Sequence, residues 1–448
     1  MKLNRKWLNE EFVDLSHVSD KEYVEKLTVF GQKVETYERM DAEIKNVVVG
    51  KVVSIVRHEN SDHMWVCQID VGGEEPVQIV TGAQNVKVGD MVPVAMHNSW
   101  LPGGVHITKG KLRGVKSNGM LCSFLELGLT QNDMPGVFAD GIWILNDEDC
   151  KPGDDINDVI GNRDTVVEFE ITNNRPDCYS IIGLARESAA AFGMQMKHHE
   201  PVVKGSNAGS IYDHLDVEVP ATELCNRYSS RMVANVKIGP SPKWLRQRLR
   251  ANGVRPINNI VDITNYIMMA YGQPLHCFDA DMIEGGKVVV KSMPEGTTFM
   301  TLDGEERKLS ERDLAICNVD APMCIAGVFG GKGSGTYETT KNILFESAYF
   351  NPTWIRKSAR RHGLQTDASF RFERGVDPNG QIYALKRAAL LAKELAGGEI
   401  AMDIKDVVAD CLPKNAVLID DAAYAHITAK RLGIRCVGVY DRFRRDDL

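Results

Sequence analysis

The sequence predicts a multidomain α+β protein, in which an N-terminal α/β unit is interrupted by a small β barrel and followed by a larger α+β domain. Three observations predict this fold class. Helical patterns occupy residues 4–12 and 20–30, whereas residues 47–145 hold short β-branched runs separated by Gly, Asn, Asp or Pro. A helical pattern returns at 181–192, and strand and helix patterns alternate beyond residue 215.

Length and composition are those of an ordinary globular protein. A chain of 448 residues is long enough for about three or more domains. Its hydrophobic content of 43% and charged content of 25% are typical of soluble proteins, and no apolar run is as long as a membrane span. The N-terminus lacks the apolar core of a secretory signal, and the ten cysteines form no CxxC or zinc-type spacing. We therefore expect a cytoplasmic protein with reduced thiols, without membrane partners.

The formal net charge of −8 argues against non-specific binding to nucleic acid, which needs a positive field. Two local basic clusters remain. The first is an acid-free stretch that contains Lys243, Arg246, Arg248, Arg250 and Arg255. The second contains Arg356, Lys357, Arg360, Arg361, Arg371 and Arg374, with Asp367 and Glu373 among them. Each cluster is either a solvated helix face or a surface that binds a polyanion.

The predicted strands of the barrel are residues 47–58, 65–72, 76–83, 91–96 and 141–145. A tight turn at 102–104 is followed by four cations, Lys109, Lys111, Arg113 and Lys116. The chain also carries, in order, a Ser-Asp-His loop after the first strand, Ile-Val-Thr-Gly-Ala-Gln-Asn and Ser-Asn-Gly-Met-Leu-Cys-Ser. This order resembles the tRNA-binding OB domain that is appended to several tRNA synthetases.

The charge of the barrel conflicts with this resemblance. Residues 41–150 hold eight Lys and Arg against fourteen Asp and Glu, a net charge of −6. Phosphate contacts need cations, so we expect weak or auxiliary RNA binding, through the four cations of the basic cluster. A barrel that serves only as a packing surface is the alternative.

The strand and helix patterns that follow the barrel predict that the N-terminal domain is completed there. The predicted domains are 1–39 together with 151–203, the barrel at 40–150, an α+β domain at 210–400 and a last segment at 408–448. The segment 173–180 places Asn173, Arg175 and Asp177 close together. It is either a catalytic loop or a turn into the next helix, capped by Asp177 or Ser180.

Residues 254–281 concentrate polar side chains in an otherwise apolar run: Asn258, Asn259, Asp262, Thr264, Asn265, Gln273, His276 and Asp279. Buried polar groups cost free energy unless they are hydrogen-bonded, so this density indicates a structural network or a site. Gln273 and Pro274 break the helical pattern, which predicts that His276 lies at a helix end or turn.

Five segments occur in this order after the barrel: RPINNIVDITNYIM, QPLHCFD, IAGVFGG, FESAYFNP and TDASFRFERGVDP. Together with the barrel they resemble the bacterial phenylalanyl-tRNA synthetase beta-subunit family, over about residues 1–410. The resemblance implies that 210–400 is a B3/B4 editing domain, which hydrolyses tyrosine wrongly esterified to tRNA(Phe). It also implies that the whole enzyme uses ATP and Mg²⁺, with its aminoacylation site in a separate alpha subunit of an α2β2 heterotetramer.

The resemblance assigns an editing site to His276, Glu346, Thr264 and Asn265, with Ala326 and Gly327 on the pocket floor. Glu346 would accept the hydroxyl of tyrosine, because a site that hydrogen-bonds a hydroxyl can select it. We expect a water positioned by His276 and backbone amides, without metal or cofactor. A thiol mechanism through Cys277 is disfavoured. A metal held by His276, Asp279 and Asp281 is disfavoured as well, since no second histidine stands at ligand spacing.

Residues 408–448 begin like the family's helical B5 domain and then depart from it. The resemblance therefore predicts a C-terminally truncated beta subunit, in which no metal ligand of the whole enzyme is present. Two alternatives stand beside an editing subunit: a non-catalytic tRNA-binding module and an inactive truncated product.

Overall fold

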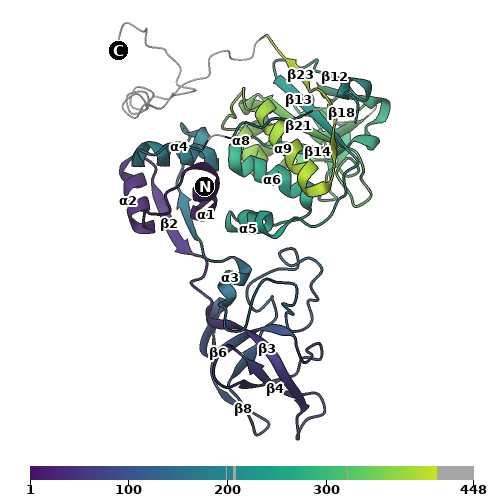
Figure 1. Cartoon of the computed structure of the whole chain (residues 1–448). Helices are drawn as coiled ribbons and strands as arrows, with labels where there is room; N and C mark the ends of the chain where they lie inside the picture. The colour runs from purple at the N-terminus through teal and green to yellow at the C-terminus, as the bar shows by residue number, and fades with distance from the viewer. Residues whose placement is uncertain (198, 205–207, 320, 411–448) are drawn as a thin grey trace.

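The computed structural model describes residues 1–197, 199–204, 208–319 and 321–410 (Figure 1). Most of the predicted segment 408–448 therefore lies outside the described residues. Segments on both sides of the barrel form one antiparallel sheet of β1 (Lys2–Asn4), β11 (Thr165–Phe169) and β2 (Val34–Arg39), in the order β1-β11-β2. β11 is the central strand, so the chain before the barrel and the chain after it meet there.

Four short helical segments flank this sheet: α1 (Arg5–Trp7), the π-helical η1 (Leu8–Phe12), α2 (Asp20–Val29) and α4 (Ile181–Phe192). The hydroxyl of Ser19 accepts from the Glu22 amide at the start of α2, and that of Ser180 accepts from the Gly183 amide at the start of α4. The second cap is at Ser180, one of the two cap positions predicted for the segment 173–180. This segment contains η3 (Pro176–Cys178) and leads into α4.

The barrel hangs below the rest of the molecule in Figure 1 and is built on a six-stranded sheet. Its strands are β3 (Lys45–Arg57), β4 (Trp65–Asp70), β5 (Val77–Thr81), β6 (Met91–Leu101), β7 (Val105–Ile107) and β10 (Gly119–Leu121). The turn η2 (Pro102–Gly104) joins β6 to β7, and a separate hairpin of β8 (Gly110–Leu112) and β9 (Val115–Ser117) projects beyond it.

Two details of the barrel differ from the sequence prediction. Residues 141–145 are not a strand, although the amides of Trp143 and Leu145 donate to the carbonyls of Cys122 and Met91. These two isolated bonds attach the segment to the barrel but do not form a β ladder. In addition, α3 (Ile156–Ile160) packs into the barrel's apolar core, so this core extends past residue 150.

The α+β domain contains two sheets. The first has the order β14-β21-β13-β22, with β23 also on β13, and the second has the order β12-β15-β18-β19-β20. The strands of the first are β13 (Cys225–Ala234), β14 (Leu275–Asp279), β21 (Ile343–Phe350), β22 (Glu399–Ile400) and β23 (Lys405–Val408). Those of the second are β12 (Asp216–Glu218), β15 (Lys287–Ser292), β18 (Leu314–Cys317), β19 (Pro322–Ile325) and β20 (Phe329–Gly330).

Helices and small elements complete the domain: α5 (Lys243–Ala251), α6 (Asn259–Tyr271), α7 (Pro352–His362), α8 (Asp367–Phe372), α9 (Gln381–Ala396), η4 (Ile211–Asp213), η5 (Ala280–Met282), η6 (Glu284–Gly286) and the hairpin of β16 (Thr298–Met300) and β17 (Glu306–Lys308). α6 and α9 share one apolar core with β21 residues Ile343 and Phe345. Leu344 and Ala348 of the same strand belong to the core on the other side, together with residues of the second sheet. The first sheet is therefore covered by helices on one side and by a sheet on the other.

The polar residues at the start of α6 form the structural network that the sequence predicts. The Asn258 side chain accepts from the amides of Ile260 and Val261 as the N-cap. Asp262 accepts from the Ser241 hydroxyl and from the Ile257 amide. The long helix α9 ends at Gly397, whose φ of 70° gives the predicted left-handed stop.

One carboxylate, that of Glu11, joins the N-terminal unit to the α+β domain. It accepts from the Trp7 indole at 2.7 Å, from the Tyr266 hydroxyl at 2.6 Å and from Arg248 at 2.9 Å. Arg387 of α9 adds a fourth donor at 3.2 Å. The Glu11 side chain is only 10% exposed, so its charge depends on these partners.

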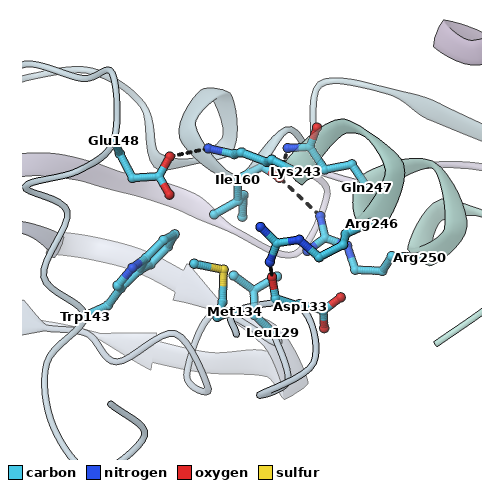
Figure 2. A pocket seen from close by; sticks show the side chains of 10 residues that line it. All are labelled: Leu129, Asp133, Met134, Trp143, Glu148, Ile160, Lys243, Arg246, Gln247 and Arg250. Carbon is cyan, nitrogen blue, oxygen red and sulfur yellow. Dashed lines mark hydrogen bonds and ion pairs between the residues drawn. The ribbon is translucent and has the colours of Figure 1, made fainter. Parts of the chain in front are cut away.

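The side chains of the first basic cluster form ion pairs and hydrogen bonds within the molecule. Lys243 pairs with Glu148, Arg246 donates to the Asp133 carbonyl and Arg250 donates to the Ile160 carbonyl (Figure 2). Arg255 donates to the Asn132 side chain, and Arg248 pairs with Glu10 and Glu11. The basic stretch on and after α5 thus docks against the acidic barrel and the N-terminal unit, which excludes it as the open polyanion surface.

We predict that Glu11→Ala lowers the free energy of unfolding by about 3–5 kcal/mol, because it removes the acceptor of Trp7 and Tyr266 and the carboxylate that pairs with the partly buried Arg387 and Arg248. Urea denaturation at pH 7 measures this. Glu10→Ala is the matched control: Glu10 pairs with the same Arg248 but its side chain is 48% exposed, so about 0–1 kcal/mol is expected. Equal losses in the two variants would contradict the role assigned to Glu11.

Candidate functional site

His276 lies in the middle of a strand, which corrects the prediction of a helix end or turn. The helix α6 ends at Tyr271 with Gly272 in the left-handed region, and Pro274 follows two residues later, but β14 begins next, at Leu275. The side chains of β14 alternate: Leu275 and Cys277 face the helical core, and His276 and Phe278 face the second sheet. This two-residue period is the signal that the sequence interpretation missed.

The strand register places His276, Glu346 and Ser230 in one row. His276 is directly opposite Glu346 across β14 and β21, and Glu346 is directly opposite Ser230 across β21 and β13. Residues that face each other across antiparallel strands point to the same side of the sheet. Glu346 therefore lies between an imidazole and a hydroxyl, on the side that faces the second sheet.

This row is surrounded by polar atoms that have no partner. Glu346 is 4% exposed and Ser230 is fully buried. Among the described residues, no hydrogen-bond partner exists for His276 Nε2, the Ser230 hydroxyl or the hydroxyl of Tyr228, which is two residues away on the same face of β13. Buried polar groups in proteins are nearly always paired, so three unpaired groups around one buried carboxyl indicate a binding site.

Burial shifts both titratable groups of the row toward their neutral forms. It raises the pKa of Glu346 to about 8 and lowers the pKa of His276 to about 4. At neutral pH the site thus holds mainly a protonated carboxyl and a neutral imidazole. Burial also raises the pKa of Tyr228 well above its ordinary value, with Glu346 as the next cause, which keeps that hydroxyl protonated. Perturbed groups in such an arrangement are typical of functional sites.

Ala326 and Gly327 belong to the turn between β19 and β20. Ala326 is 1% exposed and shares the core between the two sheets with Tyr228. Gly327 has a φ of 66°, and a Cβ there would lie 3.0 Å from Phe350, Ile355 and Phe372. At Gly330, a Cβ would approach the His276 ring to 2.9 Å. Larger side chains at these glycines would press on the aromatic lining and on the histidine itself.

Thr264 and Asn265 do not join this row. Both lie on α6, whose buried apolar residues share the helical core with Cys277 and Phe345. The Thr264 hydroxyl donates to the Val261 carbonyl of its own helix at 2.7 Å. The first sheet separates that core from the side that His276 and Glu346 face. The part of Thr264 and Asn265 in an editing site stays a prediction.

The two alternative chemistries find no support in the geometry. The Cys277 side chain faces the helical core, and burial raises the pKa of its thiol well above the ordinary value. Asp279 accepts from the Thr340 hydroxyl and Asp281 from the Asn342 side-chain amide, on the far side of β14 from His276. No cluster of three potential metal ligands occurs in the part of the chain that the structure describes.

The basic cluster of the barrel lies on the projecting hairpin β8–β9. Lys109, Lys111, Arg113 and Lys116 are all exposed, and Lys111 is directly opposite Lys116. Like charges at facing positions of a hairpin repel each other, so an anion bound between the two lysines would offset this repulsion. Arg113 stands at the turn and donates to the Asn60 carbonyl.

The residues of the second basic cluster fall into two groups, those with partners within the protein and those exposed on α7. Arg361 pairs with the buried Asp313, and Arg371 is itself buried, with its guanidinium donating to the Tyr179 carbonyl. Arg374 pairs with Glu373 and stacks on Phe370. Arg356, Lys357 and Arg360 remain exposed on α7.

A hollow of about 220 Å³ lies elsewhere, between barrel residues 131–136 and residues 240–262, with Arg246 and Asp262 in its lining. Figure 2 shows the smaller hollow beside it, where α5 meets the barrel. Neither is lined by His276 or Glu346. Both belong to the contact between the barrel and α5–α6.

Comparisons with known proteins agree on one family. Residues 47–139 match a tRNA binding domain family and residues 224–397 match the B3/4 domain family. The phenylalanine–tRNA ligase beta subunit of Bacteroides fragilis is 48% identical over 419 residues, which is 91% of this chain and 50% of that protein. That of Clostridium acetobutylicum is 46% identical over 420 residues, 94% of this chain and 52% of that protein.

The chain belongs to the phenylalanine–tRNA ligase beta-subunit family. It spans about half the length of the curated beta subunits that it matches. An N-terminal fragment of the beta subunit from Pyrococcus horikoshii aligns with 62% of this chain and 74% of that one, at 16% identity and a TM-score of 0.31, a likeness too weak to carry an argument. No described helix is long and apolar enough to cross a membrane.

Ser230, His276 and Glu346 all lie within residues 224–397, the range that matches the B3/4 domain family. Ser230 and Tyr228 were missed by the sequence interpretation. The sequence signal that could have indicated them is the pair Ser229 and Ser230 inside the strand-like run 225–234, because a polar residue that is buried in a strand needs a hydrogen-bond partner.

We predict that Glu346→Gln removes a pH-dependent loss of stability. The folded state holds the Glu346 proton more tightly than the unfolded chain does, so this stabilisation is complete below the ordinary pKa of 4.5 and is lost as pH rises through about 8. The loss is on the order of a few kcal/mol, because one unit of pKa shift is worth about 1.4 kcal/mol. His276 acts oppositely, since its contribution is lost as pH falls from 6.5 through about 4.

Urea denaturation of the wild-type chain and of Glu346→Gln at pH 5, 7 and 8.5 measures this difference. Glu306→Gln, at an exposed position of β17, is the control and should follow the wild type. Parallel stability profiles for the wild type and Glu346→Gln would show that the carboxyl titrates normally.

Proposed function

We propose that this chain carries the hydrolytic editing function of a phenylalanine–tRNA ligase beta subunit, acting on Tyr-tRNA(Phe) at the site of His276 and Glu346. The observation that supports it most directly is the row of Ser230, Glu346 and His276 between the two sheets, in which the Ser230 hydroxyl and His276 Nε2 have no hydrogen-bond partner among the described residues. The match of residues 224–397 to the B3/4 domain family agrees with this proposal.

Selection in this proposal depends on the side-chain hydroxyl of tyrosine. Glu346 forms a hydrogen bond with that hydroxyl, and the ring lies against the loop that contains Ala326 and Gly327, where small residues leave room. Phenylalanine would leave the buried carboxyl without a partner, which costs free energy that tyrosine does not lose. The site therefore prefers the amino acid that must be removed.

Hydrolysis needs little more than a positioned water. The water oxygen attacks the ester carbonyl carbon, the bond from this carbon to the ribose oxygen breaks, and a proton passes to the leaving ribose oxygen. His276 is neutral at pH 7, so it can accept a hydrogen bond from the water and orient it. No metal ion takes part in the proposed step.

Family membership supports a wider assignment for the complete enzyme. In this proposal, the beta subunit joins an alpha subunit in an α2β2 heterotetramer in the cytoplasm and binds tRNA(Phe). The alpha subunit attaches phenylalanine with ATP and Mg²⁺. The domain boundaries 1–39 with 151–203, 40–150, 210–400 and 408–448 are part of the same proposal, because β11 completes the N-terminal sheet and the barrel interrupts it.

A second role, tRNA binding by the barrel, is favoured by the exposed hairpin of Lys111 and Lys116. In this proposal a local group of cations, and not the net charge of the barrel, contacts the RNA. One barrel acid, Glu148, is paired with Lys243 of α5, and four of the barrel's eight cations lie together on or next to the hairpin. Binding through so few cations would be weak, as an auxiliary contact.

We predict that His276→Ala combined with Glu346→Ala reduces hydrolysis of Tyr-tRNA(Phe) by at least about 100-fold, since the variant has neither the partner of the hydroxyl nor the group that positions the water. Release of tyrosine from mischarged tRNA, with Phe-tRNA(Phe) as the comparison substrate, measures the rate. Cys277→Ala on the opposite face of β14 is the control and should retain activity. Unchanged hydrolysis by the double variant would rule out the editing assignment.

The RNA role makes a separate prediction. Replacing Lys109, Lys111, Arg113 and Lys116 by glutamine should weaken tRNA binding and flatten its salt dependence, by about 0.7–0.9 in log–log slope for each phosphate that is no longer neutralised. Filter binding of tRNA between 50 and 200 mM salt measures this. Lys51→Gln with Lys87→Gln, two exposed barrel lysines outside the hairpin, is the matched control. Equal affinity for the wild type and the hairpin variant would leave the barrel as a packing surface.

A further inference from the structure

The unpaired hydroxyls of Ser230 and Tyr228 are not explained by the structure of the domain. Both residues are fully buried, and neither hydroxyl has a hydrogen-bond partner among the described residues. A hydroxyl buried without a partner costs about 1–3 kcal/mol, so a position with a purely structural role would be better filled by alanine or phenylalanine. Their retention next to Glu346 indicates that a ligand completes them.

The geometry places both groups at the same carboxyl. Ser230 faces Glu346 directly across β13 and β21, and Tyr228 faces Ala348, the next residue of β21 on that side. Diagonal neighbours on one face of an antiparallel pair are within reach of a long side chain such as tyrosine. The pKa of Tyr228 is raised by the Glu346 charge in addition to burial, which agrees with this proximity.

We propose that the Ser230 and Tyr228 hydroxyls are specificity-determining groups that, together with Glu346, bind the phenolic hydroxyl of the ligand's side chain. This inference rests on the proposed function and adds residues to it. A phenol both donates and accepts a hydrogen bond. A protonated Glu346 can donate to it, and the two protein hydroxyls can donate or accept, so the three groups satisfy a phenol whatever the direction of each bond.

The same three groups reject a ligand without the hydroxyl. Phenylalanine in this site would keep Ser230, Tyr228 and Glu346 buried and unpaired, and a site built in this way discriminates far more strongly than an apolar pocket. The protein supplies no partner for the Ser230 and Tyr228 hydroxyls, and a ligand phenol would supply one, which is the proposed basis of the selectivity for tyrosine over phenylalanine.

The test uses Ser230→Ala and Tyr228→Phe in the full chain, each of which removes only a hydroxyl. We expect the ratio of kcat/KM for Tyr-tRNA(Phe) to that for Phe-tRNA(Phe) to fall at least about tenfold, and the Tm to stay equal or rise, because an unpaired polar group is removed. Ser230→Thr, which keeps a hydroxyl, should retain more of the ratio than Ser230→Ala.

Ser347→Ala is the matched control. Its hydroxyl is also buried and unpaired, on the same strand as Glu346, but it faces the helical side. Removing it should affect the Tm in the same way and leave the ratio unchanged. A lower Tm with an unchanged ratio in the Ser230 and Tyr228 variants would overturn the inference and assign them a structural role.

The two proposals fail in distinguishable ways. If Glu346→Ala abolishes selective hydrolysis while Ser230→Ala and Tyr228→Phe keep the wild-type ratio, only the present inference is wrong. If the wild-type chain releases neither amino acid, or if Glu346→Ala has no effect, the proposed editing function fails and the inference fails with it.

Discussion

The register of β14 and β13 against β21 is the constraint on which the candidate site depends. A shift of β14 by one residue would turn His276 into the helical core and bring Cys277 to Glu346. The register is held at both ends. The Gln273 amide donates to the Ala348 carbonyl at 3.1 Å before the strand, and Asp279 accepts from Thr340 at 2.6 Å at its end. Apolar side chains on alternate positions fill two different cores, so neither core tolerates a slip.

The relation between the barrel and the rest of the chain is electrostatic as much as apolar. An insert with a net charge of −6 lies beside α5, whose cations contact Glu148 and the carbonyls of Asp133 and Ile160. Glu11 performs a similar task for the N-terminal unit, with two arginines and two aromatic donors. One acid of the barrel, Glu148, is therefore used in docking, and the exposed hairpin groups four cations that a polyanion can reach.

Glu346 contrasts with another buried acid of the same domain. Asp313, a buried acid in the same domain, is satisfied by Ser358, Arg361 and His362, as a structural carboxylate should be. Glu346 has no such set of partners among the described residues, and its neighbours are unpaired as well. Proteins break local rules of polar satisfaction mainly at functional positions, at some cost in stability. This contrast within one domain separates the two carboxylates more clearly than their sequence context does.

The sequence by itself determined the helices with clear caps, most barrel strands, the interruption of the N-terminal unit and the family, because periodicity, turn residues and motif order are local signals. It also pointed to His276, Glu346, Ala326 and Gly327. Only the tertiary structure decided which side of the sheet each strand residue faces: it placed His276 in a strand and brought Ser230 and Tyr228 to the same side as Glu346. Pairing between strands more than 100 residues apart, such as β13 and β21, depends on the packing of the whole domain and leaves no pattern within any one segment.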